Sequence, residues 1–235
     1  MKPIVVATAL ALAAAQAGAV TVDDFSRNTS VRTATIPAGP APSPAFSGVE
    51  TQGGSPSYPA FESRSISATT DGTSNTTVPA TTTTQILGGA WTTTTTSAVN
   101  PGLGRVSYDT FFDLANLSPS GENQLDISIA TATAPFALVI DVFSETAATD
   151  RTFNLDASAS GTTFSVPFSA FSVGATPTDF TNLFALTVEV WLNTGGTVAI
   201  DGIETRFVEP IPLPAGLPLA LAGLATLLLL RRRTP

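Results

Sequence analysis

Short runs of alternating apolar and polar residues, separated by turn sequences, fill the chain between residues 20 and 208. The apolar positions of segments 125–130 and 184–192 fall on every second residue. A period of two places one set of side chains on one face of a β-strand and buries that face. Clusters such as 100–102 (Asn-Pro-Gly) and 193–196 (Asn-Thr-Gly-Gly) mark the turns between such runs.

Further strands are expected near residues 20–25, 85–99, 105–114, 136–144, 152–157, 162–171 and 197–208. No amphipathic helical pattern separates them. About nine short strands at this spacing predict an all-β fold, namely an antiparallel, jelly-roll-like β-sandwich. The threonine-rich stretches 81–84 and 92–96 agree, since β-branched residues favour strands.

Two segments depart from this rhythm. Pro37 to Pro59 contains six prolines and four glycines, which predicts an extended, solvated insertion after the first strand. Ser67 to Thr84 is rich in serine and threonine. It is compatible with a flexible loop or with an exposed edge strand, and the sequence does not decide between them.

The first 19 residues have the three parts of a secretory signal peptide. Lys2 supplies a charged start, Ile4 to Ala15 an apolar region, and Ala17 and Ala19 the small residues of a cleavage site. We expect export and a mature protein that begins close to Val20. A retained amino-terminal anchor is the alternative, although the apolar stretch is short for a membrane span.

A second apolar segment lies near the other end. Gly216 to Leu230 contains eight leucines and no charged residue, which favours membrane insertion by about 4 kcal/mol. A helix of this segment would be about 22 Å long, against a hydrocarbon core of about 30 Å, so the span is marginal. Arg231, Arg232 and Arg233 follow and predict a cytoplasmic end, with residues 20–210 outside.

The proline motif before this segment makes the pattern specific. Ile211-Pro212-Leu213-Pro214-Ala215, a leucine-rich stretch and three arginines resemble the VPLPA-type PEP-CTERM sorting signals of Gram-negative bacteria, with Ile211 where that family usually has valine. The resemblance implies a passage through the inner membrane, processing near the motif by an exosortase-type enzyme, and delivery to the cell surface or the exopolysaccharide matrix. A permanently anchored single-pass protein is the alternative.

The composition of residues 20–210 excludes several functions. This segment holds all 18 acidic residues of the chain and six arginines, a net charge of about −12 that repels nucleic acid. The chain has no cysteine and no histidine. Disulfides are therefore excluded, as are the usual general base and the catalytic triads and dyads that need histidine.

Four short motifs suggest a family for the domain: residues 22–25 (Val-Asp-Asp-Phe), 86–89 (Ile-Leu-Gly-Gly), 106–109 (Val-Ser-Tyr-Asp) and 200–203 (Ile-Asp-Gly-Ile). The series resembles exported jelly-roll domains of the galactose-binding or carbohydrate-binding-module type. The resemblance implies a β-sandwich and a sugar ligand.

Two groups of residues are candidates for binding. Asp23 and Asp24 near the first strand and Asp201 in the last one could converge on a structural calcium ion, which prefers carboxylate oxygens. Solvated acids are the alternative. Trp191 is out of phase with the apolar residues of 184–192, so we expect it on the opposite face, beside Glu189, where it could stack on a sugar ring. Alternatively, the proline-rich insertion covers that face.

The sequence assigns no catalytic residue. Glycoside hydrolysis needs two carboxylates about 5 to 10 Å apart, and no motif singles out a pair among the 18 acids. We therefore expect a structural or glycan-associating surface protein, with a surface glycosidase or lyase as the alternative. Acids clustered in a cleft with an aromatic side chain would favour the enzyme.

Overall fold

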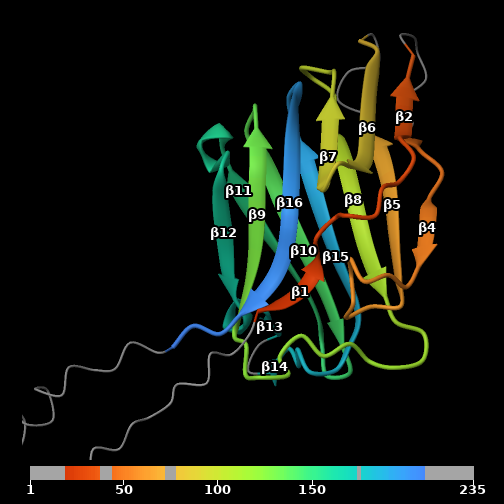
Figure 1. Cartoon of the computed structure of the whole chain (residues 1–235). Helices are drawn as coiled ribbons and strands as arrows, with labels where there is room; N and C mark the ends of the chain where they lie inside the picture. Colours follow the sequence, from red (N-terminus) through yellow and green to blue (C-terminus); the bar gives the residue numbers. More distant parts are fainter. Residues whose placement is uncertain (1–18, 38–43, 72–77, 174–175, 210–235) are drawn as a thin grey trace, which may run out of the picture.

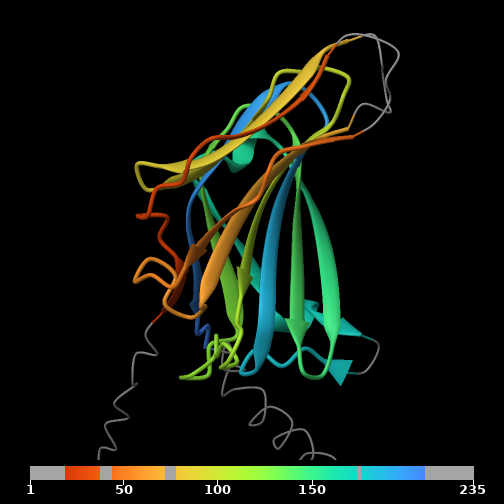
Figure 2. The same cartoon turned by 90° about the vertical axis from the view of Figure 1, so that its right-hand side faces the viewer.

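The computed structural model describes residues 19–37, 44–71, 78–173 and 176–209, and these residues form two antiparallel β-sheets packed face to face (Figures 1 and 2). The first sheet runs in the order β12-β9-β16-β7-β6-β2, with β1 beside β16. The second runs in the order β11-β10-β15-β8-β5-β3, with β4 beside β5. The predicted antiparallel β-sandwich is thus confirmed.

The strands of the first sheet are β1 (Val20–Asp23), β2 (Arg32–Ile36), β6 (Ala80–Leu87), β7 (Ala90–Thr95), β9 (Gln124–Ala132), β12 (Thr162–Pro167) and β16 (Gly196–Arg206). Those of the second are β3 (Ala45–Phe46), β4 (Glu50–Gly53), β5 (Ser63–Thr70), β8 (Gly102–Asp109), β10 (Phe136–Ser144), β11 (Ala148–Leu155) and β15 (Leu183–Leu192). A separate two-stranded ribbon consists of β13 (Ser172–Val173) and β14 (Thr176–Pro177). There are also two short 3₁₀ helices in the described residues, η1 (Ala157–Ala159) and η2 (Phe168–Ala170).

The core lies between the sheets and follows the period-two pattern. Leu125, Ile127 and Ile129 of β9 are buried, as predicted. In β15 the prediction holds from Leu186 onward but is wrong for Phe184, which is 48% exposed. The β10–β15 register shifts beside Leu183, so that Leu183 is the buried residue instead.

Two threonine-rich segments differ from their expected structures. Residues 85–99 form the end of β6 and the whole of β7, joined by a hairpin turn at Gly88 and Gly89. Both glycines have positive φ, 64° and 83°, the backbone that a two-residue hairpin turn with the right twist requires. Segment 67–84 includes parts of β5 and β6, each paired on both sides. Its strand residues belong to inner strands rather than to an edge, and Asp71, Val78 and Pro79 lie between the two strands.

The Pro/Gly-rich segment is also more ordered than expected. Within residues 44–59, strands β3 and β4 both pair with β5, and Tyr58 is fully buried. The extended, largely solvent-exposed character expected of the segment holds for most of this part. The sequence did not predict that β3 and β4 would complete the edge of the second sheet.

The signal peptide, the sorting motif Ile211 to Ala215 and the cluster Arg231 to Arg233 lie outside the described residues, as does the apolar segment 216–230. Among the residues with described structure, no helix is long and apolar enough to span a membrane.

Candidate functional site

A groove with a volume of about 540 Å³ lies on the outer face of the second sheet. Its floor comes from β5, β8 and β15, whose outward side chains stand next to one another in the antiparallel register. Its wall comes from β3 and the turn that follows. The lining residues are Pro44, Phe46, Ser47, Val49, Ser67, Ala68, Thr69, Asp71, Pro101, Leu103, Arg105 and Trp191.

Trp191 is held in this groove through a carboxylate. Its indole Nε1–H donates a 2.8 Å hydrogen bond to Oε2 of Glu189, two residues earlier on the same face of β15. Arg105 donates from Nε to the other oxygen at 2.6 Å, and its second guanidinium nitrogen completes an ion pair. Because both carboxylate oxygens are engaged, the orientation of the indole is fixed while part of its surface remains open to solvent.

The structure thus places Trp191 on the expected outer face of its strand. The Pro/Gly-rich segment reaches the same groove. Phe46 and Val49 of that segment are 71% and 62% exposed, so they border the groove without closing it. The two alternatives of the sequence analysis are therefore combined: the segment forms a wall beside the indole and leaves the space next to it open.

The carboxylates on this face have unequal surroundings. The side chain of Glu189 is 6% exposed, whereas that of Arg105 is 48% exposed. Solvent therefore reaches the ion pair from the arginine side. Asp141, on the neighbouring strand β10, lies opposite Asp150 of β11. Burial raises the pKa of Asp141 above its ordinary value; Glu189 and Asp150 raise it further and Arg105 opposes them. Asp141 does not line the groove.

The three aspartates proposed for calcium have different environments. Asp24 and Asp201 line a shallow depression beside β1 and β16. Asp23 borders it as well, but its carboxylate is buried and accepts hydrogen bonds at 2.7 to 2.9 Å from Arg64, Tyr108 and the backbone of Phe25. No group of three or more Asp, Glu, His or Cys side chains in the described ranges is arranged to hold a metal ion. The calcium ion stays a prediction.

Asp23 instead joins the two sheets. It ends β1 of the first sheet, whereas Arg64 and Tyr108 belong to β5 and β8 of the second. Arg64 is itself fully buried, lies 4.7 Å from the centre of the Tyr58 ring, and donates to the carbonyl of Arg27. Burial raises the pKa of Asp23, and its Arg64 and backbone partners counteract that rise. The motif at residues 22–25 is therefore structural.

The groove has the chemistry of a binding site. A fixed aromatic plane, a second aromatic side chain and hydrogen-bonding groups on its floor match what a sugar ring presents, namely apolar C–H faces and hydroxyl edges. Glu189 is bonded to Trp191 and Arg105 and is not among the lining residues, whereas Asp71 is. Among the described residues of the lining, Asp71 has no second acid beside it.

Sequence reasoning found Trp191 but missed Phe46 and Arg105. The proline-rich context of Phe46 concealed a strand, and the ion pair of Arg105 joins residues 84 positions apart in the sequence. The period-two pattern does place Arg105 on the outer face of its strand, and only the β8–β15 pairing brings it opposite Glu189.

No family model and no curated protein matches the chain. Several solved structures are similar. A family 11 carbohydrate-binding module of cellulosomal cellulase Lic26A-Cel5E of Clostridium thermocellum has 14% identity and a TM-score of 0.41, and the match covers 83% of this chain and 98% of the module. The solution structure of CtCBM11 has 12% identity and a TM-score of 0.45, over 85% and 100% of the two chains.

An exo-β-agarase matches with 10% identity and a TM-score of 0.41, over 81% of this chain and 25% of the agarase. At such identities and TM-scores, neither the ligand nor the activity of these proteins carries over to this chain.

Proposed function

We propose that the chain is an exported protein whose β-sandwich associates with a glycan through the groove beside Trp191. The observation that carries this proposal is the indole of Trp191, held by its 2.8 Å hydrogen bond to Glu189 and exposed to the groove. A preset aromatic ring loses little conformational entropy on binding, which favours the stacking of a sugar ring. Phe46 provides a second apolar surface across the groove.

The charge of the domain restricts which class of glycan it can bind. Glu189 is neutralised by Arg105, and the domain as a whole carries a large negative charge. A polyanionic polysaccharide would be repelled by this surface. We therefore propose a neutral glycan.

The destination of the protein is also part of the proposal. The signal-peptide pattern and the motif Ile211 to Ala215 support export, a stage in the inner membrane with Arg231 to Arg233 in the cytoplasm, and processing by an exosortase-type enzyme. The exopolysaccharide of the cell surface or matrix is then the partner that the groove would meet.

The binding proposal is tested by affinity electrophoresis of the protein through gels that contain neutral polysaccharides, including the exopolysaccharide of the host. Trp191→Ala and Phe46→Ala should each weaken retardation by about tenfold in apparent affinity, the equivalent of one lost stacking contact of about 1.4 kcal/mol. Phe143→Ala is the matched control, because Phe143 is a 43% exposed aromatic residue on the same sheet that does not line the groove.

Equal retardation of all the variants would refute the groove as the binding site. The same samples are assayed for new reducing ends. Release of sugar fragments by the unaltered protein would support the glycosidase alternative instead, and its persistence in Trp191→Ala would place that activity elsewhere on the surface.

A further inference from the structure

Three exposed phenylalanines gather at one end of the sandwich, away from the groove. Phe111 and Phe112, in the loop after β8, are 68% and 93% exposed, and Phe184 at the start of β15 is 48% exposed. The loop and the strand adjoin, since the Thr110 N–H donates to the Phe184 carbonyl at 3.0 Å. We call Phe111, Phe112 and Phe184 the aromatic end patch.

The loop is held so that these rings stay outside. The Glu62 carboxylate accepts hydrogen bonds from three consecutive backbone N–H groups, those of Phe111 at 2.8 Å and of Phe112 and Asp113 at 3.1 Å. Two residues further on, Ala115 and Leu183 exchange a pair of 2.9 Å backbone bonds. The loop is thus fixed at both ends, and its apolar side chains are displayed rather than buried.

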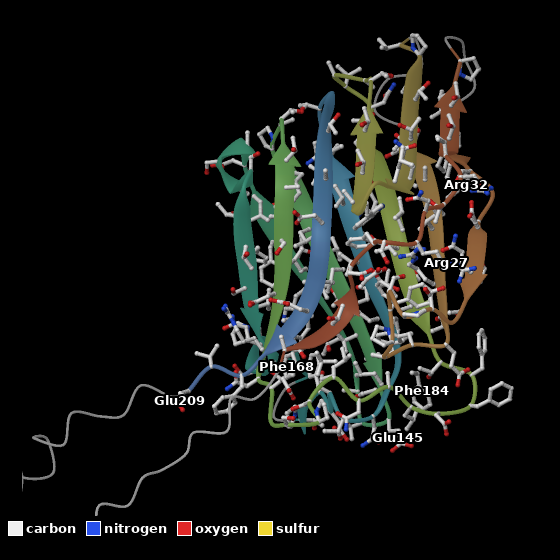
Figure 3. All side chains as sticks on the ribbon, viewed as in Figure 1. Arg27, Arg32, Glu145, Phe168, Phe184 and Glu209 are labelled. Atoms are coloured by element: carbon white, nitrogen blue, oxygen red, sulfur yellow. The ribbon has the colours of Figure 1, made fainter. Side chains whose placement is uncertain are left out.

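The same end of the molecule is where the chain leaves the sandwich. In Figures 1 and 3, β8 ends, β15 begins and β16 ends at the lower end, where Phe184 and Glu209 are labelled. After β16, Asn123 holds Val208 by two hydrogen bonds of 2.9 Å, one in each direction. The point at which the chain leaves the sandwich is therefore fixed by the fold.

The residues that follow in the sequence include the apolar segment 216–230. Only a few residues separate this segment from Val208, so a membrane that holds the segment must lie close to the end of the sandwich that carries the patch. Exposed phenylalanine is unfavourable in water and favourable at the boundary between headgroups and acyl chains. A second copy of this strongly negative domain is a poorer partner, because the two copies repel each other.

We propose that the aromatic end patch inserts into the membrane interface while the tail is anchored, and so orients the sandwich with the groove to the side. This inference rests on the membrane stage of the proposed function. It assigns the loop a second, weaker contact with lipid that is lost once the tail is processed.

The test uses the full-length chain in vesicles of zwitterionic phosphatidylcholine and phosphatidylethanolamine. Because the chain has no cysteine, Asp113→Cys carries a single fluorophore in the loop. Asn193→Cys, in the turn between β15 and β16 at the opposite end (Figure 1), carries the same label as a control. Flotation reports anchoring of the tail, and quenching by nitroxide lipids reports the depth of the label.

We expect both labelled proteins to float, with strong quenching only at position 113. Adding Phe111→Ser and Phe112→Ser should reduce that quenching to the level of the control without changing flotation. Flotation with equal, weak quenching at both positions would overturn the inference and leave the membrane stage standing.

A lack of flotation would contradict the membrane stage itself and the inference with it, since the patch would then have no bilayer beside it. A sedimentation coefficient that falls on the double serine substitution, with quenching unchanged, would instead assign the patch to a second copy of the chain.

Discussion

Individual carboxylates on the groove face contribute differently to the protein. The negative charge of Glu189 is balanced by Arg105, and its carboxylate positions Trp191. Asp141 stands near Glu189 and Asp150, and burial together with these charges raises its pKa. A carboxyl group whose pKa is raised by folding stabilises the folded state only at low pH, and this contribution is lost as the pH rises through the folded pKa.

Asp141→Asn should therefore stabilise the protein at neutral pH, by at most about 1 kcal/mol because solvent screens a partly exposed side chain. The gain should shrink on acidification and vanish below pH 3.8, the ordinary pKa of an aspartate side chain, where Asp141 is protonated in both the folded and the unfolded state. Thermal unfolding of the two proteins between neutral pH and pH 3.8 measures this difference in stability. Asp156→Asn is the control, because the Ser158 hydroxyl and N–H lower the pKa of Asp156. This variant should gain no stability at neutral pH. An equal gain in stability for both variants would contradict the account.

Among the elements, β7 and β8 of opposite sheets approach closely. Strand β8 carries Gly102 and Gly104, and a Cβ atom built on Gly104 would lie 1.9 Å from the hydroxyl of Thr93. Two of the threonines between the sheets are bonded to each other: Thr84 and Thr93 share a 3.1 Å hydrogen bond, and the Trp91 indole donates to Thr84 at 2.7 Å. This half of the interior is thus polar, narrow and dependent on glycine.

Gly104→Ala should destabilise the fold by about 3 kcal/mol, the upper end of the usual cost of overpacking, because the clash is with a side chain fixed by its own hydrogen bond. Chemical denaturation gives the change in the free energy of unfolding. Gly53→Ala is the control, since no atom lies within 4 Å of its added Cβ. Similar stability of the two variants would show that the sheets can separate without cost.

The sequence predicted the elements with a clear apolar pattern, such as β9 and most of β15, which alternate, and β10, which is apolar along most of its length. It missed β2, a short strand that buries only Ala34 and Ile36. It left most of β5 undecided, because polar residues of that strand face the interior: Thr70 is fully buried and bonded to Thr82 at 2.8 Å. The sequence also predicted one strand where the end of β6 and the whole of β7 lie, because the Gly88-Gly89 turn between them is only two residues long. Period-two reasoning depends on hydrophobic contrast, and this protein buries hydroxyl groups in pairs.

On the scale of the whole molecule, the sandwich separates two surfaces. The groove lies on the outer face of the second sheet. The aromatic end patch lies at the end where the chain leaves the sandwich, and Figure 3 shows Phe184 and Glu209 at that end. Local patterning predicted the outward face of Trp191. It could not predict Phe46 or Arg105 as its neighbours, because their proximity results from strand pairing over long sequence separations.

The measurement that tests the central claim most directly is an NMR titration of the two indole N–H resonances with a neutral glycan fragment. The chain has two tryptophans. Trp191 lies in the groove, whereas Trp91 is buried and bonded to Thr84, so it serves as an internal control. The account predicts a saturable shift of the Trp191 resonance alone. Glycan binding that leaves the Trp191 resonance in place would contradict it.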